Sequence, residues 1–378
     1  MSNKTKTILF LPFLQIPSGH HQCADALIHG IQQICPNIKC DKVDILGYSY
    51  GKIEKLVSTV YLKWIHAFPR IYNFIYQHSV YKNREQNKRY RLYEYLFIHF
   101  IKKLLQEMRP DLIICTHALP AYMLNYLKKN KLITIPVINV YTDYFIHRFW
   151  GVEHIDFHFI STQFMKKFLN EKGIADERIF ITGIPIHSKI EKKKLAVVPV
   201  VKQRYSVLIA GGNLGVGELE ELIEKIKNIK SPSLIKYYVL CGKNVKLYNK
   251  LKDKKKSHLT PLPYIHCRDE MNRLYDQMDA IITKPGGVTV SESLFKRKPV
   301  FIYNALPGQE QINLQQLNNL GLVFQLKKEN IHEQMFAILQ NIIELQKYLN
   351  CVEHFHSQIY PEEPVELITK ILTNQIRG

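Results

Sequence analysis

Short apolar runs alternate with helix-like stretches along most of this chain, and this alternation limits its fold more than any other feature. In the first half, runs with the length of buried strands occur at Thr7–Pro12, Asp111–Cys115, Pro136–Tyr141, Phe157–Ile160 and Ile179–Thr182. A Gly-containing loop and a helical pattern over Gln22–Ile34 follow the first run, which is how a Rossmann-like unit begins. The alternation predicts an α/β fold whose parallel sheet is covered by helices on both faces.

The alternation lapses once and then starts again. Residues Ser188–Arg204 are basic, contain proline and lack clear periodicity, so we expect a linker there. Beyond it we expect strands at Tyr205–Ala210, Tyr237–Cys241, Ala280–Thr283, Val300–Tyr303 and Leu322–Gln325, and helices at Glu218–Lys230, Ile331–Leu349 and Val365–Ile376. The 378 residues therefore divide into a domain of residues 1–190, a second domain of residues 204–355 and a C-terminal helix within 356–378.

The charge balance predicts an anionic partner. Lys and Arg number 52 against 33 Asp and Glu, which gives a net charge of +19. Nucleic acid, a membrane surface and a phosphorylated substrate all fit such an excess. The seven cysteines form no C-x-x-C pair, which argues against a disulfide framework or a zinc site and favours a reducing, cytosolic compartment. No apolar run is long enough to span a membrane, and we expect the N-terminal run to be a strand and not a signal peptide.

The stretch Tyr48–Phe100 has no convincing strand and is rich in aromatic and basic residues. It holds fourteen Tyr, Trp and Phe residues and nine Lys and Arg residues, but only Glu54, Glu85 and Glu94 as acids. Rings mixed with cations suit a lipid headgroup boundary. They also suit single-stranded nucleic acid, and the third interpretation is an insertion whose rings pack on the domain. The composition leaves these three interpretations open.

A strand that runs into Lys284-Pro-Gly-Gly dominates the second half. We expect a helix to begin near Thr289, and the glycines Gly286 and Gly287 would let backbone N–H groups approach an anion such as a diphosphate. Glu292 would then lie in the first turn of that helix, where its carboxylate can accept hydrogen bonds from a ribose diol. The alternative is that Glu292 only interacts favourably with the helix dipole. Together these features predict a nucleotide site.

Three segments carry a resemblance to a known family. TKPGGVTVSESLFKRKPVFIYNALPGQEQIN, PSGHHQCADAL and TDYFIHRFWGVEHIDFHFISTQFMKKFLNEKGIADERIFITGIPI resemble the signatures of the monogalactosyldiacylglycerol synthase and processive diacylglycerol glucosyltransferase family. These enzymes are relatives of the GlcNAc transferase that makes the peptidoglycan lipid intermediate. The resemblance implies a GT-B fold, in which two Rossmann-like domains face each other across a cleft. The C-terminal domain would hold a UDP-sugar, and the N-terminal domain would receive the acceptor.

The resemblance also assigns donor-binding roles. Gly286 and Gly287 would approach the diphosphate at the start of the Thr289 helix, and Glu292 would hold the ribose. The remaining donor-side assignments are Gln309 and Glu310 for sugar hydroxyls with Asn313 nearby, Tyr264 and Ile265 for uracil, Lys284 as a cation near the leaving UDP, and Gly211, Gly212 and Asn213 for the diphosphate. The alternative for the turn at Gly211, Gly212 and Asn213 is a tight connection between a strand and a helix. The alternative for Lys284 is a solvated side chain without a binding role.

The implied reaction is inverting glycosyl transfer, which needs a general base for the acceptor hydroxyl. His20 and Asp143 are the candidates, alone or together. The alternative for His20 is a loop histidine that caps a helix or binds phosphate, and the alternative for Asp143 is a carboxylate that caps a turn. His21 directly follows His20 and could be mistaken for it. Gly19, His147 and Trp150 belong to the acceptor side. The sequence contains no D-x-D motif, so no metal is expected.

We therefore expect an enzyme that moves a hexose, glucose in the first place, from a UDP-sugar to diacylglycerol. It would work without a cofactor, bound peripherally to an anionic membrane at the cytoplasmic face. One alternative is a UDP-GlcNAc transferase acting on an isoprenoid-linked lipid, and another is a nucleotide-sugar-binding protein without activity. Nucleic acid is not expected as a partner, because no RNA- or DNA-binding motif is present.

Overall fold

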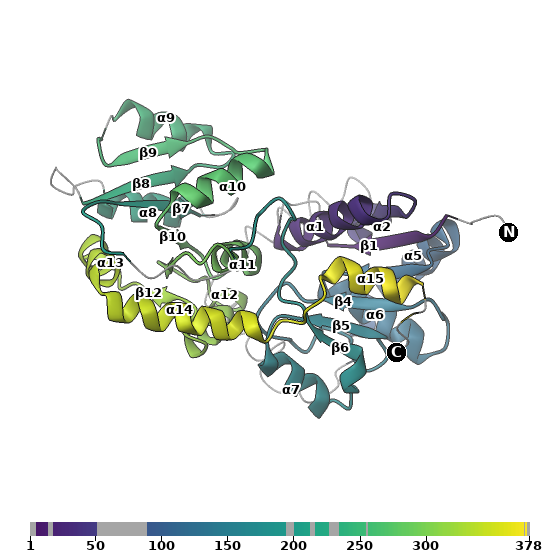
Figure 1. Ribbon diagram of the computed structural model, residues 1–378. Coiled ribbons are helices and arrows are strands. Elements are labelled where there is room, and N and C mark those ends of the chain that lie inside the picture. Colours follow the sequence, from purple (N-terminus) through teal and green to yellow (C-terminus); the bar gives the residue numbers. More distant parts are fainter. Residues whose placement is uncertain are drawn as a thin grey trace. The chain divides into compact units, whose positions relative to one another are not determined.

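The computed structural model describes residues 5–13, 18–50, 89–193, 200–211, 216–226, 234–254, 256–373 and 375. It forms two compact units (Figure 1). The first unit consists of Met1–His187, Pro307–Gln309 and Gln358–Gly378, and the second consists of Ser188–Leu306 and Glu310–Ser357. Most of the aromatic and basic stretch, residues 51–88, lies outside the described residues, as do residues 194–199 of the expected linker.

The first unit is built on a six-stranded parallel sheet. Its strands are β1 (Thr7–Leu11), β2 (Lys39–Lys42), β3 (Leu112–Cys115), β4 (Val137–Val140), β5 (Phe157–Ile160) and β6 (Ile179–Ile181), in the order β2-β1-β3-β4-β5-β6. Ile8 pairs with Leu112, and Ile113 pairs with Val137. The four central strands are nearly continuous runs of buried apolar residues, which is the pattern of a parallel sheet covered on both faces.

Helices cover both faces of this sheet. They are α1 (Gly19–Ile34), α2 (Ile45–Tyr50), α5 (Arg91–Met108), α6 (Ala118–Lys129), α7 (Gln163–Glu171), the short 3₁₀ helix Asp176–Arg178 and α15 (Pro364–Leu372). On one face, α5, α6 and α7 form a core with the sheet, and on the other face α1 and α15 do. At Gly30 of α1, a Cβ atom would come within 2.7 Å of Val365. The C-terminal helix α15 is therefore packed closely into the first unit.

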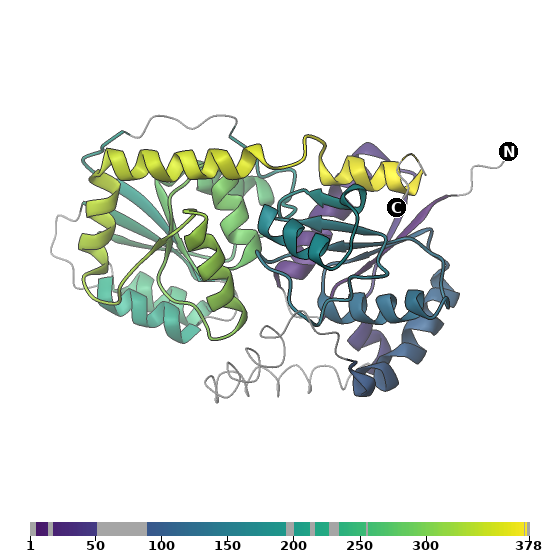
Figure 2. The same ribbon diagram turned by 90° about the horizontal axis from the view of Figure 1, so that it is seen from below.

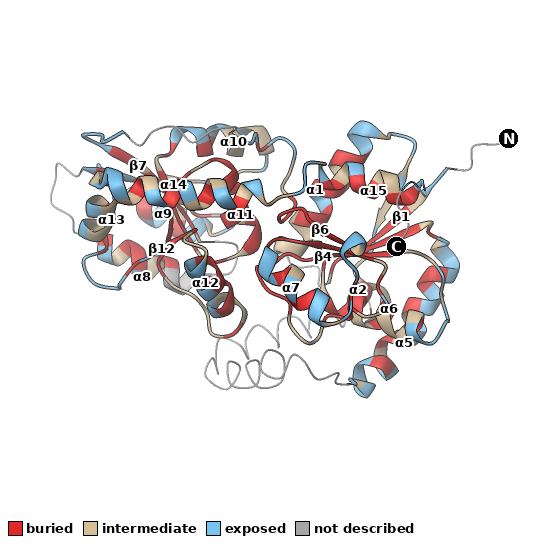
Figure 3. Cartoon of the chain, turned by 60° about the horizontal axis from the view of Figure 1, so that its bottom comes forward, coloured by how far each residue is buried: buried red, intermediate tan, exposed pale blue. Residues whose placement is uncertain are grey.

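The second unit repeats this architecture with a second parallel sheet. Its strands are β7 (Tyr205–Ala210), β8 (Ile235–Leu240), β9 (Leu259–Leu262), β10 (Ala280–Thr283), β11 (Val300–Ile302) and β12 (Phe324–Gln325), in the order β12-β11-β10-β7-β8-β9. Its helices are α8 (Val216–Ile226), α9 (Val245–Asp253), α10 (Arg268–Gln277), α11 (Gly287–Phe295), α12 (Gln309–Asn319), α13 (Ile331–Gln340) and α14 (Ile342–Ser357). Figure 2 shows helices on both faces of the sheet in each unit. Figure 3 shows the strands as the buried interior.

All ten strands expected from the apolar runs are confirmed, but β2 and β9 were missed. Both are edge strands. β2 has the sequence KCDK with no fully buried residue, and β9 contains Pro261. Charged residues and proline are features of edge strands and weaken the strand signal in the sequence.

Several expected helix boundaries differ from those in the structure. The helix expected over Ile331–Leu349 is two helices, because Asn341 leaves the helical conformation (φ −92°, ψ 94°) and its side chain accepts a hydrogen bond from Glu344 N, 3.1 Å away. Asn341 thus begins a new helix in the way that N-cap residues do. In addition, α1 begins at Gly19 and not at Gln22, and α11 begins at Gly287 and not near Thr289. Both of these helices begin closer to the candidate site residues than expected.

Candidate active site

Loops after β1, β3 and β4 bring the acceptor-side candidates together in the first unit. These three strands are neighbours in a parallel sheet, so their carboxyl ends lie at one edge, where α/β proteins bind ligands. His20 is the second residue of α1, after β1. Thr116 and His117 follow β3, and Asp143 follows β4. The structure therefore places both candidate bases at the same edge.

The hydrogen bonds of His20 define which of its nitrogens carries the proton. Its Nδ1 lies 2.7 Å from the Thr116 carbonyl oxygen and 2.8 Å from Thr142 Oγ1. A carbonyl oxygen can only accept, so Nδ1–H is the donor and, in the neutral ring, Nε2 keeps its lone pair. Burial lowers the pKa of His20, although the charge of Asp143 and the bond to Thr116 oppose this effect. The His20 ring is thus neutral at pH 7.

Asp143 is buried, and its own contacts hold it in place. Its main-chain oxygen accepts a hydrogen bond from Ser161 Oγ over 3.0 Å, and its Oδ2 accepts one from Gln309 Nε2 over 2.6 Å. Gln309 lies in the short segment Pro307–Gln309, which belongs to the first unit. The negative charge of Asp143 raises the pKa of His20, so the two candidate bases are electrostatically linked.

His117 lies beside His20 and was missed in the sequence. The two ring centroids are 4.8 Å apart in a T-shaped arrangement, and Phe13 stacks on the His117 ring at 4.7 Å. His117 Nδ1 accepts a hydrogen bond from Leu119 N over 3.1 Å and so caps α6. Burial and the neighbouring histidines hold the pKa of His117 well below its usual value. The available signal was its place two residues after a buried strand, at the sheet edge where His20 and Asp143 also lie.

The other acceptor-side candidates, Gly19, His147 and Trp150, also lie in the first unit. Gly19 is the first residue of α1. His147 Nδ1 accepts a hydrogen bond from Phe149 N over 3.2 Å, and burial together with His20 lowers the pKa of His147 to about 3. Trp150 is buried, with its ring 4.4 Å from that of Tyr141. The charge of His20 thus acts on His147, whereas Trp150 is a residue of the hydrophobic core.

In the second unit, β10 leads into the expected glycine-rich turn. Gly286 is the N-cap of α11 with φ −87° and ψ 141°, and Gly287 and Thr289 lie in the first turn. A Cβ atom at Gly286 would meet nothing within 4 Å. Neither the backbone conformation nor protein packing therefore requires glycine here. The free N–H groups of a helix N-terminus lie next to this open space, an arrangement that binds anions.

Glu292 lies in the second turn of α11 and not in the first, because the helix begins two residues earlier than expected. It is 4% exposed; Tyr275 OH donates a hydrogen bond to it over 2.9 Å, and Arg268 lies 3.5 Å away. Burial raises the pKa of Glu292, while Arg268 and Tyr275 oppose this effect. Helix-dipole stabilisation is confined to the first turn, so that alternative does not explain a buried carboxylate at this position.

The remaining donor-side candidates lie mostly at the same carboxyl edge. Gly211 directly follows β7 and would place a Cβ atom 3.3 Å from Leu219, so it packs tightly on α8. Gly212 and Asn213 lie outside the described residues. Tyr264 and Ile265 follow β9, and the Tyr264 ring is 4.4 Å from His266. A hollow at this edge is lined by Ile209, Ala210, Gly211, Leu219, Leu222, Ile282, Thr283, Lys284, Tyr303 and Asn304.

Side chains at the start of α12 are linked to this edge. Glu310 Oε2 accepts a hydrogen bond from Leu306 N over 2.7 Å, and Glu310 Oε1 lies 3.9 Å from Lys284 Nζ. Asn313 is 1% exposed. The structure thus brings Lys284 and Glu310 together, whereas Gln309 contacts Asp143 in the first unit.

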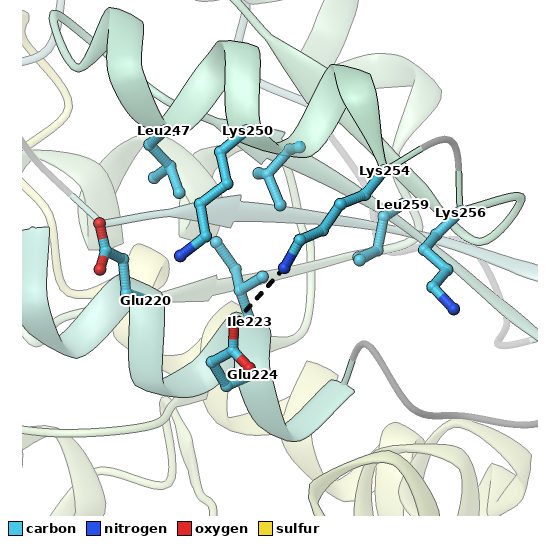
Figure 4. Close-up of a pocket in the computed structure, with 9 residues that line it drawn as sticks. Glu220, Ile223, Glu224, Leu247, Lys250, Lys254, Lys256 and Leu259 are labelled. Carbon is cyan, nitrogen blue, oxygen red and sulfur yellow. Dashed lines mark ion pairs between the residues drawn. The ribbon is translucent and has the colours of Figure 1, made fainter.

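A second hollow, between α8, α9 and β9, lies at the amino end of β9 and away from these candidates. Figure 4 shows Lys254 paired with Glu224 at its rim, at 3.9 Å. Within the described residues, no helix is long and apolar enough to cross a membrane. The same part of the chain contains no group of three His, Cys, Asp or Glu side chains that could hold a metal ion.

Solved structures share this fold over nearly the whole chain. MurG of Acinetobacter baumannii superposes with a TM-score of 0.60 at 14% identity, over 98% of this chain and 99% of MurG. The glycotransferase of kitacinnamycin has a TM-score of 0.59 at 10% identity, over 99% and 100% of the two chains. Together with the two six-stranded parallel sheets, these matches define a GT-B glycosyltransferase fold, which confirms the expected fold class.

Sequence comparisons identify the family. The monogalactosyldiacylglycerol (MGDG) synthase model matches residues 20–186, and the glycosyltransferase family 28 C-terminal domain matches residues 206–361. YkoN of Bacillus subtilis (strain 168), described as an uncharacterized glycosyltransferase, is 39% identical over 98% of both chains. A processive diacylglycerol beta-glucosyltransferase of Bacillus cereus (strain AH187) is 30% identical over 93% of this chain and 89% of its own.

This chain is therefore a UDP-sugar-dependent glycosyltransferase. It belongs to the monogalactosyldiacylglycerol synthase and processive diacylglycerol glucosyltransferase family, as the three sequence segments implied.

Gly286 provides a test of the anion site that separates binding from folding. Gly286→Ala adds a methyl group to open space, so it should change the free energy of unfolding by about 1 kcal/mol or less. If the diphosphate binds here, the same methyl group occupies space that it needs, and the Kd for UDP should rise at least about tenfold. Urea denaturation and calorimetric titration with UDP measure the two effects. Unchanged UDP affinity in a folded variant would show that the diphosphate binds elsewhere.

Proposed function

We propose that this chain transfers glucose from UDP-glucose to the free hydroxyl of diacylglycerol, with inversion at the anomeric carbon. The observation that carries the proposal is the hydrogen bond between His20 Nδ1 and the Thr116 carbonyl oxygen at the carboxyl edge of the first sheet, because it leaves the lone pair on Nε2. The choice of glucose and diacylglycerol is supported by the relatives named processive diacylglycerol beta-glucosyltransferases.

The chemistry requires one base and a stabilised leaving group. The acceptor oxygen attacks the anomeric carbon while His20 Nε2 takes the hydroxyl proton, and the bond from the anomeric carbon to the UDP oxygen breaks. UDP leaves with the bonding electron pair. Because UDP-glucose carries an α-linked glucose, a single displacement gives a β-glucoside. A neutral His20 suits this role, since a protonated imidazole could not accept the proton.

The second unit would bind the donor. In this proposal, the N–H groups at Gly286 and Gly287 and the ammonium group of Lys284 stabilise the negative charge on the diphosphate. Glu292, held by Tyr275 and Arg268, accepts hydrogen bonds from the ribose hydroxyls. Further proposed contacts are those of Gln309, Glu310 and Asn313 with the sugar, Tyr264 and Ile265 with uracil, and Gly211, Gly212, Asn213 and Thr289 around the diphosphate.

We also propose that the enzyme binds peripherally to the anionic cytoplasmic face of a membrane, where diacylglycerol resides. The start of α5 exposes Leu92 (67%), Tyr93 (41%) and Tyr95 (86%) beside the exposed Arg91. Apolar and aromatic side chains next to cations suit a headgroup boundary. The start of α5, as far as Phe100, belongs to the aromatic and basic stretch, so the described part of that stretch has an exposed face.

Transfer to lipid vesicles tests the proposal. The protein is incubated with labelled UDP-glucose and vesicles of phosphatidylcholine and phosphatidylglycerol that contain dioleoylglycerol. We expect labelled glycolipid with a β-anomeric proton signal, and less product at high salt or without phosphatidylglycerol. UDP-galactose and UDP-GlcNAc are run as donor controls. Label that stays in the aqueous phase would reject the acceptor, and an α-anomeric product would reject the inverting mechanism.

The pH dependence of an Asp143 variant separates the two candidate bases. The charge of Asp143 raises the pKa of His20, so Asp143→Asn should lower that pKa further. If His20 is the base, the acid limb of kcat/KM should remain and move to lower pH, because the variant ring stays neutral at lower pH than in the wild type. His20→Asn, with similar size and no basic nitrogen, should abolish turnover and keep UDP binding. An acid limb that disappears in Asp143→Asn would identify Asp143 as the base.

A further inference from the structure

His117 lies between the two candidate bases along the sheet edge. β3, which it follows, is hydrogen-bonded to β1 on one side and to β4 on the other. Its neighbour Thr116 receives the hydrogen bond from His20, and its own ring contacts the His20 ring. His117 therefore adjoins the proposed base through both its main chain and its side chain.

The cap on α6 determines the protonation of the His117 ring. Because Nδ1 accepts a hydrogen bond from Leu119 N, that nitrogen carries no proton. Burial keeps the ring neutral at pH 7, so its single proton lies on Nε2. Among the described residues, no hydrogen bond is made by this Nε2–H group. His117 thus has the opposite tautomer to His20: it presents a donor where His20 presents an acceptor.

The chemistry of the proposed acceptor fits this pair. The reacting hydroxyl must donate its hydrogen to His20 Nε2, which leaves the donor of His117 for a different oxygen. In diacylglycerol, the oxygens next to the free hydroxyl belong to esters, which only accept hydrogen bonds. A fixed neutral N–H group beside the base matches an ester carbonyl, and it attracts no counter-ion that would compete for the place.

We propose that His117 Nε2–H donates a hydrogen bond to an ester carbonyl of the acceptor lipid and so makes the enzyme specific for acylglycerols. This inference rests on the proposed function, since it assumes that diacylglycerol is the acceptor. His117 would be a specificity-determining residue that contacts the substrate. Phe13, stacked on the His117 ring, would hold that ring in place.

The test combines a protein variant with a substrate analogue. His117→Asn keeps a side-chain oxygen that can accept from Leu119 N and cap α6, but it removes the imidazole donor. The acceptors are 1,2-dioleoylglycerol and its ether analogue 1,2-dioleylglycerol, which lacks ester carbonyls. His154→Asn is the matched control, because His154 is exposed in the same unit and only its main-chain N–H is hydrogen-bonded. Urea denaturation and UDP affinity verify that each variant is folded.

We expect the wild type and His154→Asn to prefer the diacyl lipid over the dialkyl lipid by about three- to tenfold in kcat/KM. His117→Asn should lose that preference by losing activity on the diacyl lipid alone. His117→Phe, which keeps a ring that can stack on Phe13 and removes both nitrogens, should behave in the same way and provides a second variant if His117→Asn does not fold.

Two outcomes would overturn the inference while leaving the proposed function intact. One is a wild type that uses both lipids equally well. The other is a His117→Asn protein that loses activity on both lipids by the same factor, which would mean that His117 acts only on His20 or on the loop. A wild type that transfers glucose to neither glycerolipid would reject the proposed function itself.

Discussion

Parallel strand pairing is the constraint on which the candidate residues of each unit depend. In each unit, six strands run in the same direction, so every connection that follows a strand begins at one edge of the sheet. This edge gathers His20, His117 and Asp143 from three separate parts of the sequence, and in the second unit it gathers Gly211, Lys284 and Gly286. The strands are buried on both faces, so polar groups of functional use are confined to the loops at their ends.

Within the first unit, hydrogen bonds to the backbone determine what each histidine can do. His20 donates from Nδ1 to a carbonyl oxygen, whereas His117 and His147 accept on Nδ1 from main-chain N–H groups. Three imidazoles that look alike in the sequence therefore differ in the position of their protons. Burial lowers the pKa of all three rings, so these differences persist at neutral pH. Of the three rings, only that of His20 donates a hydrogen bond from Nδ1, so only His20 keeps a lone pair on Nε2.

The sequence predicted the strands that have a clear local pattern of apolar residues and missed those that lack one. Buried strands such as Phe157–Ile160 and Ala280–Thr283 were found with the correct bounds, because burial on both faces requires a continuous apolar run. The edge strands Lys39–Lys42 and Leu259–Leu262 were missed because one edge strand is charged and the other contains proline.

The candidate site shows the same division. The motifs led to His20, Asp143, Gly286 and Glu292, but the start of α11 was misplaced by two residues, which put Glu292 in the wrong turn. Its partners Tyr275 and Arg268 come from α10, and no spacing rule connects them to it. His117 became a candidate only when its ring was found beside that of His20. A single sequence contains no information on which loops meet at the sheet edge beyond the order of the strands.

The proposed mechanism depends on a neutral His20 ring whose lone pair lies on Nε2. Nitrogen-15 NMR of protein labelled at histidine measures this directly, with His20→Asn used to assign the signals. At pH 7, the His20 ring should show a protonated-type shift at Nδ1 and an unprotonated-type shift at Nε2. A proton on Nε2, or an imidazolium with both nitrogens protonated, would contradict this assignment of His20 as the base.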